Sequence, residues 1–327
     1  MKTAGGTGTT RSREAASAAA SLLAVKEQFP DCYSTLDATT VTTFEEIFAQ
    51  VQGHGKTILE VGSGHGFTCL LFALLGAREV HGIDVVPSAV QIAEEVGRRV
   101  DPNLPVVFRL ADAARGLPYD DETFDVVLLI ETLSHVVMAE LGAFLREMLR
   151  VLRPGGFLYL SDGNNARSWR RRRQNYRIWE RFDQGPPTRA NETVYSHRVR
   201  TPYAALRREI ALKAVPSLSE EAAEQCAART FRFTAAEVGE AARQYAASGE
   251  WPNSPFRRRL CPIDPTQGIY IEQLIDPLEV RRHLKAAGCE EVFCGPRRHL
   301  PLQPLWTACP GVTFLFTNGF KIVSRKR

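Results

Sequence analysis

The chain has 327 residues, of which 44% are apolar and 24% charged, and its formal net charge is +4. These values are typical of a globular protein with a hydrophobic core, and so small a positive charge argues against a dedicated nucleic-acid binder. No stretch approaches the roughly 18 apolar residues of a membrane-spanning helix, so we expect a cytoplasmic protein without a membrane partner.

The chain contains seven cysteines, which are scattered and form no C-x-x-C pair. This pattern predicts reduced thiols in a cytosolic protein rather than a disulfide framework. Cys289, Cys294 and Cys309 lie close in sequence, but their spacing matches no zinc motif, and we expect no metal site.

Residues 1–21 consist mainly of Ala, Ser, Thr and Gly and cannot form a core, so they are predicted to be a flexible N-terminal tail. Their Ser and Arg content faintly resembles a mitochondrial transit peptide, although a plain tail is the favoured interpretation. Helices are expected over residues 15–29 and 43–51.

Residues 57–66 read Thr-Ile-Leu-Glu-Val-Gly-Ser-Gly-His-Gly, an apolar run that ends in Gly62, Gly64 and Gly66. The run suits a strand buried in a parallel sheet, and the apolar residues 67–75 suit the helix that follows it. A strand, a glycine-rich turn and a helix N-terminus together form a nucleotide-cofactor site. The dinucleotide motif G-x-G-x-x-G is not met, because Phe67 stands where its third glycine is required.

The order Glu-x-Gly-x-Gly-x-Gly resembles the first motif of the class I S-adenosylmethionine-dependent methyltransferases. Later positions extend the resemblance over about a hundred residues. Strand 80–83 ends at Asp84, whose carboxylate can accept the two ribose hydroxyls, and a helix over 89–100 follows with Ser88 as its N-cap. Strands are also predicted over 106–110 and 124–130, and the Leu-Arg-Pro-Gly-Gly run from residue 152 leads into a fifth.

The resemblance implies S-adenosyl-L-methionine as the cofactor. It places Asp112 at the adenine amino group and Glu131 beside the methionine part. The residues that we expect to bind the cofactor are Glu60, Gly62, Gly64, Gly66, Asp84, Val85, Asp112, Ala113 and Glu131.

Residues 276–294 predict a helix, which ends at Gly288, and a sixth strand. Residues 312–323 alternate as a last strand that is interrupted at Asn318 and Gly319. The expected fold class is therefore α/β, a Rossmann-like seven-stranded and mostly parallel sheet with helices on both faces. By resemblance, the last strand runs antiparallel to the others.

Residues 165–272 exceed any ordinary loop and should carry structure of their own. Helices are predicted over 206–215, 220–229 and 235–247, and three of the four tryptophans fall within this insertion. We interpret it as a helical cap that binds substrate, with residues 22–164 and 273–327 forming the methyltransferase core.

Methyl transfer from a sulfonium requires alignment and exclusion of water, and a hydroxyl acceptor also benefits from a general base. His135, four residues beyond Glu131, and Asp162, which follows the fifth strand, are the catalytic candidates. Asn164 and Asn165 are candidates for binding the substrate, although turn formation explains these two residues equally well.

Residues 167–200 contain ten arginines against three acidic residues. If residues 166–182 are helical, Trp169, Tyr176 and Trp179 share a side that would pack inward, and an arginine side faces outward. The basic side could be a solvated face, a pocket for an anionic substrate, or a nucleic-acid track. The first two interpretations are favoured, so Trp169 and Arg170 join the substrate-binding candidates and nucleic acid is not the expected partner.

The preferred function is methyl transfer to a small-molecule acceptor, possibly anionic, with oxygen as the methylated atom. Two alternatives stay open. One is an RNA or protein methyltransferase that docks through the arginine-rich helix, and the other is a non-catalytic module that retains the cofactor fold. The sequence leaves the oligomeric state open.

Overall fold

The computed structural model describes residues 22, 26–30, 32–33, 36–186, 193–194, 197–198, 201–253, 259–297 and 303–327. The predicted flexible tail of residues 1–21 lies outside this part of the chain, as does most of the helix predicted over residues 15–29.

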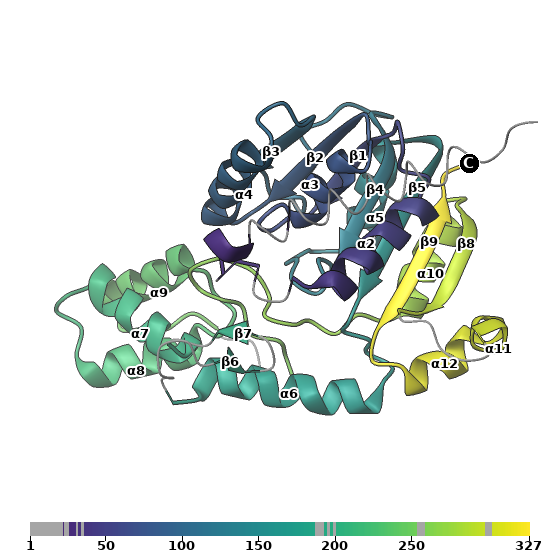
Figure 1. Cartoon of the computed structure of the whole chain (residues 1–327). Helices are drawn as coiled ribbons and strands as arrows, with labels where there is room; N and C mark the ends of the chain where they lie inside the picture. The colour runs from purple at the N-terminus through teal and green to yellow at the C-terminus, as the bar shows by residue number, and fades with distance from the viewer. Residues whose placement is uncertain are drawn as a thin grey trace, which may run out of the picture.

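A seven-stranded sheet with the order β3-β2-β1-β4-β5-β9-β8 forms the centre of the protein (Figure 1). The strand β9 runs antiparallel to both of its neighbours, whereas the first five strands pair in parallel, so the predicted fold class is confirmed. The strands are β1 (Thr57–Val61), β2 (Glu79–Asp84), β3 (Val106–Leu110), β4 (Phe124–Ile130), β5 (Leu152–Asp162), β8 (Glu290–Pro296) and β9 (Phe320–Arg325).

Neighbouring residues of the central strands point to opposite faces of the sheet, as the pleat requires. Ile58 packs with the helices α2 (Ala38–Gln50), α3 (Phe67–Leu74) and α4 (Pro87–Val100) on one face. Leu59 packs with α5 (Leu141–Arg150) and α10 (Pro277–Ala286) on the other. Both faces of the sheet are therefore buried, which explains why its strands read as continuous apolar runs.

Two predicted helix starts differ from the structure. The helix predicted over residues 43–51 is α2, which begins five residues earlier because Asp37 accepts a hydrogen bond from the Thr40 amide and caps it. Ser88 does not cap α4: the helix begins at Pro87 with Val86 as N-cap. Proline is favoured at the first helical position because it lacks the amide hydrogen that would have no partner there.

The prediction of one strand over residues 312–323 is wrong in its first half. The structure has α11 (Gln303–Ala308) and α12 (Pro310–Phe316) before β9 begins at Phe320. Pro310 starts α12, and Phe314 of this helix is fully buried in the main core. Periodicity alone does not distinguish a short apolar strand from one turn of buried helix.

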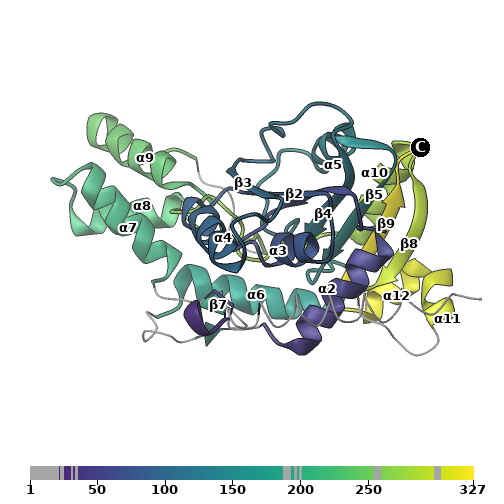
Figure 2. The ribbon, with the colours of Figure 1, turned by 45° about the horizontal axis from the view of Figure 1, so that its top comes forward.

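The segment between β5 and α10 carries its own secondary structure and projects to one side of the sheet (Figure 2). Two small apolar clusters stabilise it. One joins the helix α6 (Trp169–Gln184) to Tyr203, Cys261 and Ile271. The other joins the three helices α7, α8 and α9 that follow in the segment. Its elements are α6 (Trp169–Gln184), β6 (Thr193–Val194), β7 (His197–Arg198), α7 (Tyr203–Ala214), α8 (Glu220–Arg229) and α9 (Ala235–Ser248). We retain its description as a substrate cap as a proposal.

The aromatic side of α6 does not pack inward as a unit. Trp179 is buried, but Trp169 is 55% exposed and Tyr176 is 36% exposed. The buried stripe is instead formed by Asn175, Ile178, Trp179 and Phe182, which recur at the three- and four-residue spacing of one helix face.

A buried ion pair joins α6 to α7. The Arg207 guanidinium is fully buried, its Nη2 donates to Asp183 Oδ1 at 2.7 Å, and its Nε donates to the carbonyl oxygen of Ala227 at 3.0 Å. The pair therefore links three helices of the inserted segment through one side chain.

We predict that Asp183→Ala lowers the free energy of unfolding by about 3 kcal/mol, because it leaves a buried guanidinium charge without its counterion. Urea denaturation followed by tryptophan fluorescence measures the change. Glu240→Ala, which removes an exposed pair with Arg243, is the matched control and should cost less than about 1 kcal/mol. Equal effects of the two substitutions would contradict a structural role for the buried pair.

Candidate functional site

The carboxyl ends of β1 to β4 meet at one edge of the sheet, and a cavity of about 710 Å³ opens there. Its floor is formed by the turns that follow these strands. Its roof comes from the inserted segment, which contributes Thr234 at the start of α9 and the residues Gln267, Gly268 and Ile269. Residues far apart in the sequence thus enclose a single space.

The glycine-rich turn after β1 forms one wall. All three glycines have positive φ, the region that L side chains rarely adopt. A β-carbon at Gly62 would lie 2.5 Å from Thr132 Cγ2, and one at Gly66 would lie 2.6 Å from Phe108 Cζ. A β-carbon at Gly64 would meet no atom within 4 Å. The outer glycines are therefore required by packing, and the middle one leaves the turn open for a ligand to approach.

Asp84 holds this turn in place from the end of β2. Its Oδ2 accepts a hydrogen bond from the Gly64 amide at 2.8 Å, and its Oδ1 accepts one from the Val86 amide at 2.9 Å. Each carboxylate oxygen has a further lone pair, so the group can still accept hydrogen bonds from a ligand in the cavity.

Asp112 and Glu131 follow β3 and β4 along the same edge. Asp112 accepts a hydrogen bond from the Ala114 amide and pairs with Arg115 at 3.1 Å. Glu131 has a positive φ, lies 2.5 Å from Arg297 Nη1 and accepts a hydrogen bond from the Gly163 amide. Burial and the nearby Asp162 carboxylate raise the pKa of Glu131 above its usual range.

His135 lines the cavity beneath the roof and is held by Tyr270 of the inserted segment. The His135 Nδ1 lies 2.8 Å from the carbonyl oxygen of Tyr270, and the Tyr270 amide donates to the His135 carbonyl oxygen at 2.9 Å. Because a carbonyl oxygen only accepts, Nδ1 must carry the proton, and the lone pair of the neutral ring is therefore on Nε2. The tautomer that the backbone selects is the one in which Nε2 is the basic nitrogen.

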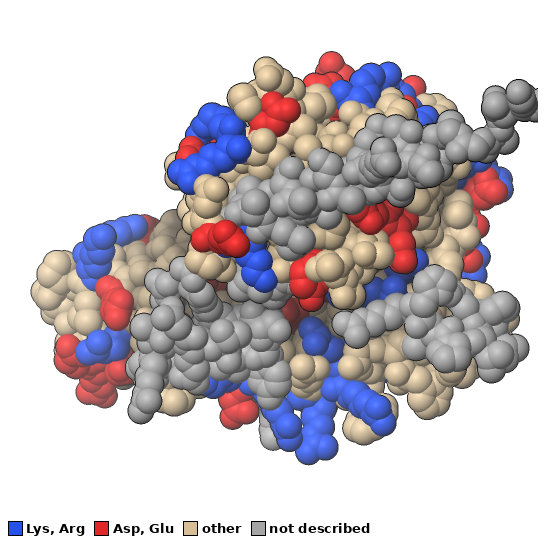
Figure 3. All heavy atoms as spheres, in the orientation of Figure 1, with Lys and Arg blue, Asp and Glu red and all other residues tan. Residues whose placement is uncertain are grey.

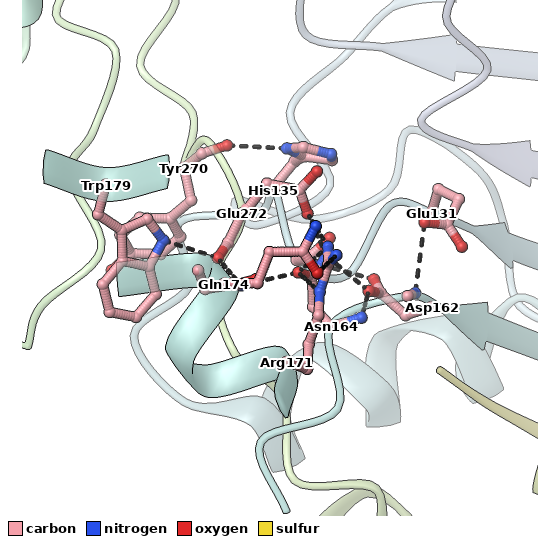
Figure 4. Close-up of polar contacts among 12 residues, drawn as sticks. Glu131, His135, Asp162, Asn164, Arg171, Gln174, Trp179, Tyr270 and Glu272 are labelled. Atoms are coloured by element: carbon pink, nitrogen blue, oxygen red, sulfur yellow. Dashed lines mark hydrogen bonds and ion pairs between the residues drawn. The ribbon is translucent and has the colours of Figure 1, made fainter. Parts of the chain in front are cut away.

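A buried polar network lies behind His135, where the inserted segment joins the sheet (Figure 4). Asp162 is fully buried; its Oδ2 accepts from the Ser134 amide at 3.0 Å and its Oδ1 from the Asn164 amide at 2.8 Å. Burial raises the pKa of Asp162, and these two amide hydrogen bonds oppose the rise. Asp162 thus fixes the turn that carries His135.

The side chain of Asn164 links this turn to the inserted segment. Its Nδ2 donates to Glu272 Oε2, and its Oδ1 accepts from Arg171 Nη2 at 2.7 Å and from Asn175 Nδ2 at 2.8 Å. The carbonyl oxygen of Glu272 in turn accepts from the Trp179 indole at 2.9 Å. The side-chain amide of Asn164 is therefore hydrogen-bonded both to α6 and to Glu272, which lies in the stretch before α10.

The structure brings together seven of the nine predicted cofactor residues at the cavity. Those that line it are Gly62, Gly64, Asp84, Val85, Asp112, Ala113 and Glu131, and His135 joins them. Glu60 and Gly66 do not line the cavity: Glu60 is buried beside Cys69, and Gly66 is the N-cap of α3.

The remaining predicted site residues lie elsewhere. The side chains of Asp162 and Asn164 form hydrogen bonds within the buried polar network where the inserted segment joins the sheet. Asn165 Nδ2 donates to the carbonyl oxygens of Phe314 and Thr317 at the end of α12. Trp169 and Arg170 are exposed on α6 and do not line the cavity.

Several lining residues carried no signal in the sequence. The roof residues Thr234, Gln267, Gly268 and Ile269 belong to the insertion, and the helices predicted there did not point to them. Val136, Val137 and Ala139 follow His135 and read as an ordinary apolar stretch. Tyr33 and Phe44 do not line the cavity; Tyr33 donates to the carbonyl oxygen of His65 at 2.6 Å, and Phe44 packs edge-on against Phe67.

Among the residues that the structure describes, no group of three or more His, Cys, Asp or Glu side chains is arranged to hold a metal ion. Cys289 and Cys294 are buried and Cys309 is exposed.

A family model described as a methyltransferase domain matches residues 59–160. Over these residues the chain is similar to S-adenosylmethionine-dependent methyltransferases. The match begins within β1 and ends at residue 160 within β5, and it thus includes the ends of β1 to β4 that border the cavity.

Curated relatives match a similar stretch. The 27-O-demethylrifamycin SV methyltransferase of Amycolatopsis mediterranei is 38% identical over 108 residues, which are 33% of this chain and 39% of that protein. The norajmaline N-methyltransferase of Rauvolfia serpentina is 37% identical over 112 residues, 34% of this chain and 37% of that protein. The chain thus spans well under half the length of these relatives.

Among solved structures, the PH0226 protein of Pyrococcus horikoshii is 13% identical, with a TM-score of 0.48, and the similarity covers 88% of this chain and 90% of that one.

The cofactor of this methyltransferase family, S-adenosylmethionine, suits the residues around the cavity. Gly64 leaves open space where a nucleoside sulfonium would lie against the backbone, and the Asp84 carboxylate beside it can accept hydrogen bonds from hydroxyl groups.

We predict a pH-dependent contribution to stability from Glu60, the acid of the glycine motif. It is 3% exposed, the Cys69 thiol donates to its Oε2, and burial raises its pKa from 4.5 to about 7. Between these two values the folded protein binds more protons than the unfolded chain, so this contribution falls as the pH rises and is constant above them.

Denaturation at matched pH values tests this prediction against Glu60→Gln, which does not titrate. The stability of the wild type relative to the variant should fall by on the order of 3 kcal/mol across the window. A pH-independent difference would show that Glu60 titrates normally.

Proposed function

We propose that this protein transfers a methyl group from S-adenosylmethionine to a small-molecule acceptor that binds between the sheet edge and the cap. The observation that carries the proposal is the cavity at the sheet edge, which is lined by the turns after β1 to β4, by His135 and by residues of the inserted segment. A roofed cavity with few polar groups is typical of sites for small organic molecules.

In this proposal the cofactor occupies the side of the cavity formed by the glycine turn. Asp84 would accept the ribose hydroxyls, Asp112 and Ala113 would contact the adenine, and Glu131 would lie near the methionine part. The bound sulfonium supplies an activated methyl group. The protein's own task is to align the acceptor and to exclude water, for which Ile269 and Thr234 provide the roof.

The acceptor would occupy the side lined by His135, Val136 and Val137. We infer that oxygen is the methylated atom, because the backbone of Tyr270 selects the His135 tautomer whose Nε2 can remove a proton from a hydroxyl. Asp162 acts in this proposal as a positioning residue, since it holds the Ser134 amide and hence the turn that carries His135.

The alternative in which the arginine-rich helix docks an RNA or protein substrate has less support. The exposed arginines of α6 do not line the cavity. A substrate held on that face would have to reach the methyl group past the roof.

The function can be tested by incubating the purified full chain with S-adenosylmethionine carrying a deuterated methyl group and with a panel of phenols, carboxylic acids and amines. Mass spectrometry identifies any acceptor that gains the label, and fragmentation identifies the methylated atom. Cofactor binding without transfer to any acceptor, including RNA and protein, would favour a non-catalytic module.

We predict that Asp84→Ala weakens binding of S-adenosylhomocysteine more than tenfold, because it removes a two-point contact to the ribose. Isothermal calorimetry measures the affinity. Asp120→Ala, at an exposed aspartate outside the cavity, should leave the affinity unchanged. Wild-type affinity in the Asp84 variant would remove this residue from the cofactor site.

We predict that His135→Ala lowers kcat by about 100-fold or more while the affinity for S-adenosylhomocysteine stays nearly constant, because a lost general base affects the reaction and not cofactor binding. Initial rates and calorimetry on the same preparation separate the two effects. His54→Ala, at an exposed histidine distant from the cavity lining, is the control. Undiminished turnover in the His135 variant would exclude it as the base.

A further inference from the structure

Two helices outside the cavity carry most of the large apolar side chains that the described part of the chain exposes. Five of these nine residues lie on α6 or α12: Trp169, Tyr176, Val312, Leu315 and Phe316. Phe316 is 65% exposed and Val312 is 57% exposed. Scattered exposed apolar residues are ordinary, but their concentration on adjacent elements is typical of an interaction surface.

The two helices are adjacent although more than a hundred residues separate them in the sequence. Asn165, before α6, donates to the carbonyl oxygens of Phe314 and Thr317 at 2.7 and 2.6 Å. The N-cap of α6, Ser168, donates to Asn318 Oδ1 at 3.0 Å. The start of α6 is therefore fixed against the end of α12, as Figures 1 and 2 both show.

The exposed side of α6 is strongly basic. Arg170, Arg172, Arg173 and Arg177 are all exposed, and no ion pair joins them to another residue in the described part of the chain. Arg170 lies over the Trp169 ring, with its Cζ 5.4 Å from the ring centroid. Figure 3 shows basic side chains gathered along this lower edge beside an uncharged region. We call these four arginines and the five apolar residues the basic–apolar face.

We propose that the basic–apolar face docks the protein on the surface of an anionic lipid bilayer. Such a surface attracts arginines through its headgroups and accepts aromatic and aliphatic side chains at the boundary with the acyl chains. The long arginine side chains can reach the phosphates while the apolar residues beside them enter the interface.

The aliphatic members distinguish a bilayer from RNA. Single-stranded nucleic acid is held by basic side chains and by flat aromatic rings on which bases stack. Val312 and Leu315 offer no such platform, yet they are exposed with Phe316 on α12, at the spacing of one helix face. Exposed aliphatic side chains beside exposed arginines complement a lipid interface better than a base and phosphate track.

The absence of a spanning segment does not bear on this contact. Within the described residues, no helix is long and apolar enough to cross a bilayer. The sequence-based expectation of no membrane partner rested on that criterion, whereas interfacial docking requires only an exposed face of suitable chemistry.

Flotation of the purified full chain with vesicles tests the proposal. The protein should float with vesicles of phosphatidylcholine mixed with phosphatidylglycerol and remain unbound with phosphatidylcholine alone. Arg173→Glu/Arg177→Glu should lower partitioning roughly tenfold or more, because two attractive charges become repulsive. Phe316→Ser should also lower it severalfold.

Matched controls keep the result interpretable. Lys213→Glu/Arg229→Glu makes the same change in charge on exposed residues of α7 and α8, and Val292→Ser removes an exposed apolar residue of β8. Both should bind like the wild type, and circular dichroism melting should show that all variants are folded.

Three results would overturn the proposal. The first is the absence of binding to anionic vesicles. The second is equal binding to neutral and anionic vesicles, or equal losses in the test and control variants. The third is binding of single-stranded RNA that depends on Arg173 and Arg177 but not on Phe316, which would assign the face to nucleic acid.

Discussion

The joint between the inserted segment and the carboxyl ends of β4 and β5 is the interaction on which the site depends. Asp162 and Asn164 lie at and just beyond the end of β5, and both are fully buried. Their side chains form hydrogen bonds with the Ser134 amide, with Asn175 of α6 and with Glu272. A buried polar network of this kind favours one arrangement of the segments that meet there, because each broken contact would leave a polar group without a partner away from water.

This joint explains how the inserted segment, with its own small apolar clusters, reaches the edge of the sheet that borders the cavity in a defined position. From Tyr270 to Ile275, the returning chain forms backbone hydrogen bonds with His135, Ser134 and Asn164. The same stretch continues back to Gly268 and Ile269 in the roof. One short segment therefore holds Gly268 and Ile269 over the cavity and also selects the tautomer of His135. A change in the position of this segment would alter both.

The opposite side of α6 serves a different purpose. Its inward stripe, from Asn175 to Phe182, completes the cap and the joint, whereas its outward side carries arginines that take no part in either. One helix thus connects the interior of the proposed enzyme to an exposed surface. On our proposal, a bilayer at that surface would lie beside the cap that covers the acceptor side of the cavity.

The sequence by itself determined the central sheet, because strands buried on both faces must read as apolar runs and the turn after β1 requires glycines. It also carried the resemblance to S-adenosylmethionine-dependent methyltransferases, through the glycine order after β1 and through Asp84, Asp112 and Glu131, which stand at or just beyond the ends of parallel strands. Only the tertiary structure decided the role of Asp162, Asn164 and Asn165, because a polar residue after a strand looks the same whether it faces a cavity or a joint. The tertiary structure also decided that Trp169 is exposed, that residues 310–316 are helical and that Ile269 covers the cavity. These features depend on contacts between segments that are distant in the sequence, and such contacts produce no periodic pattern of apolar residues.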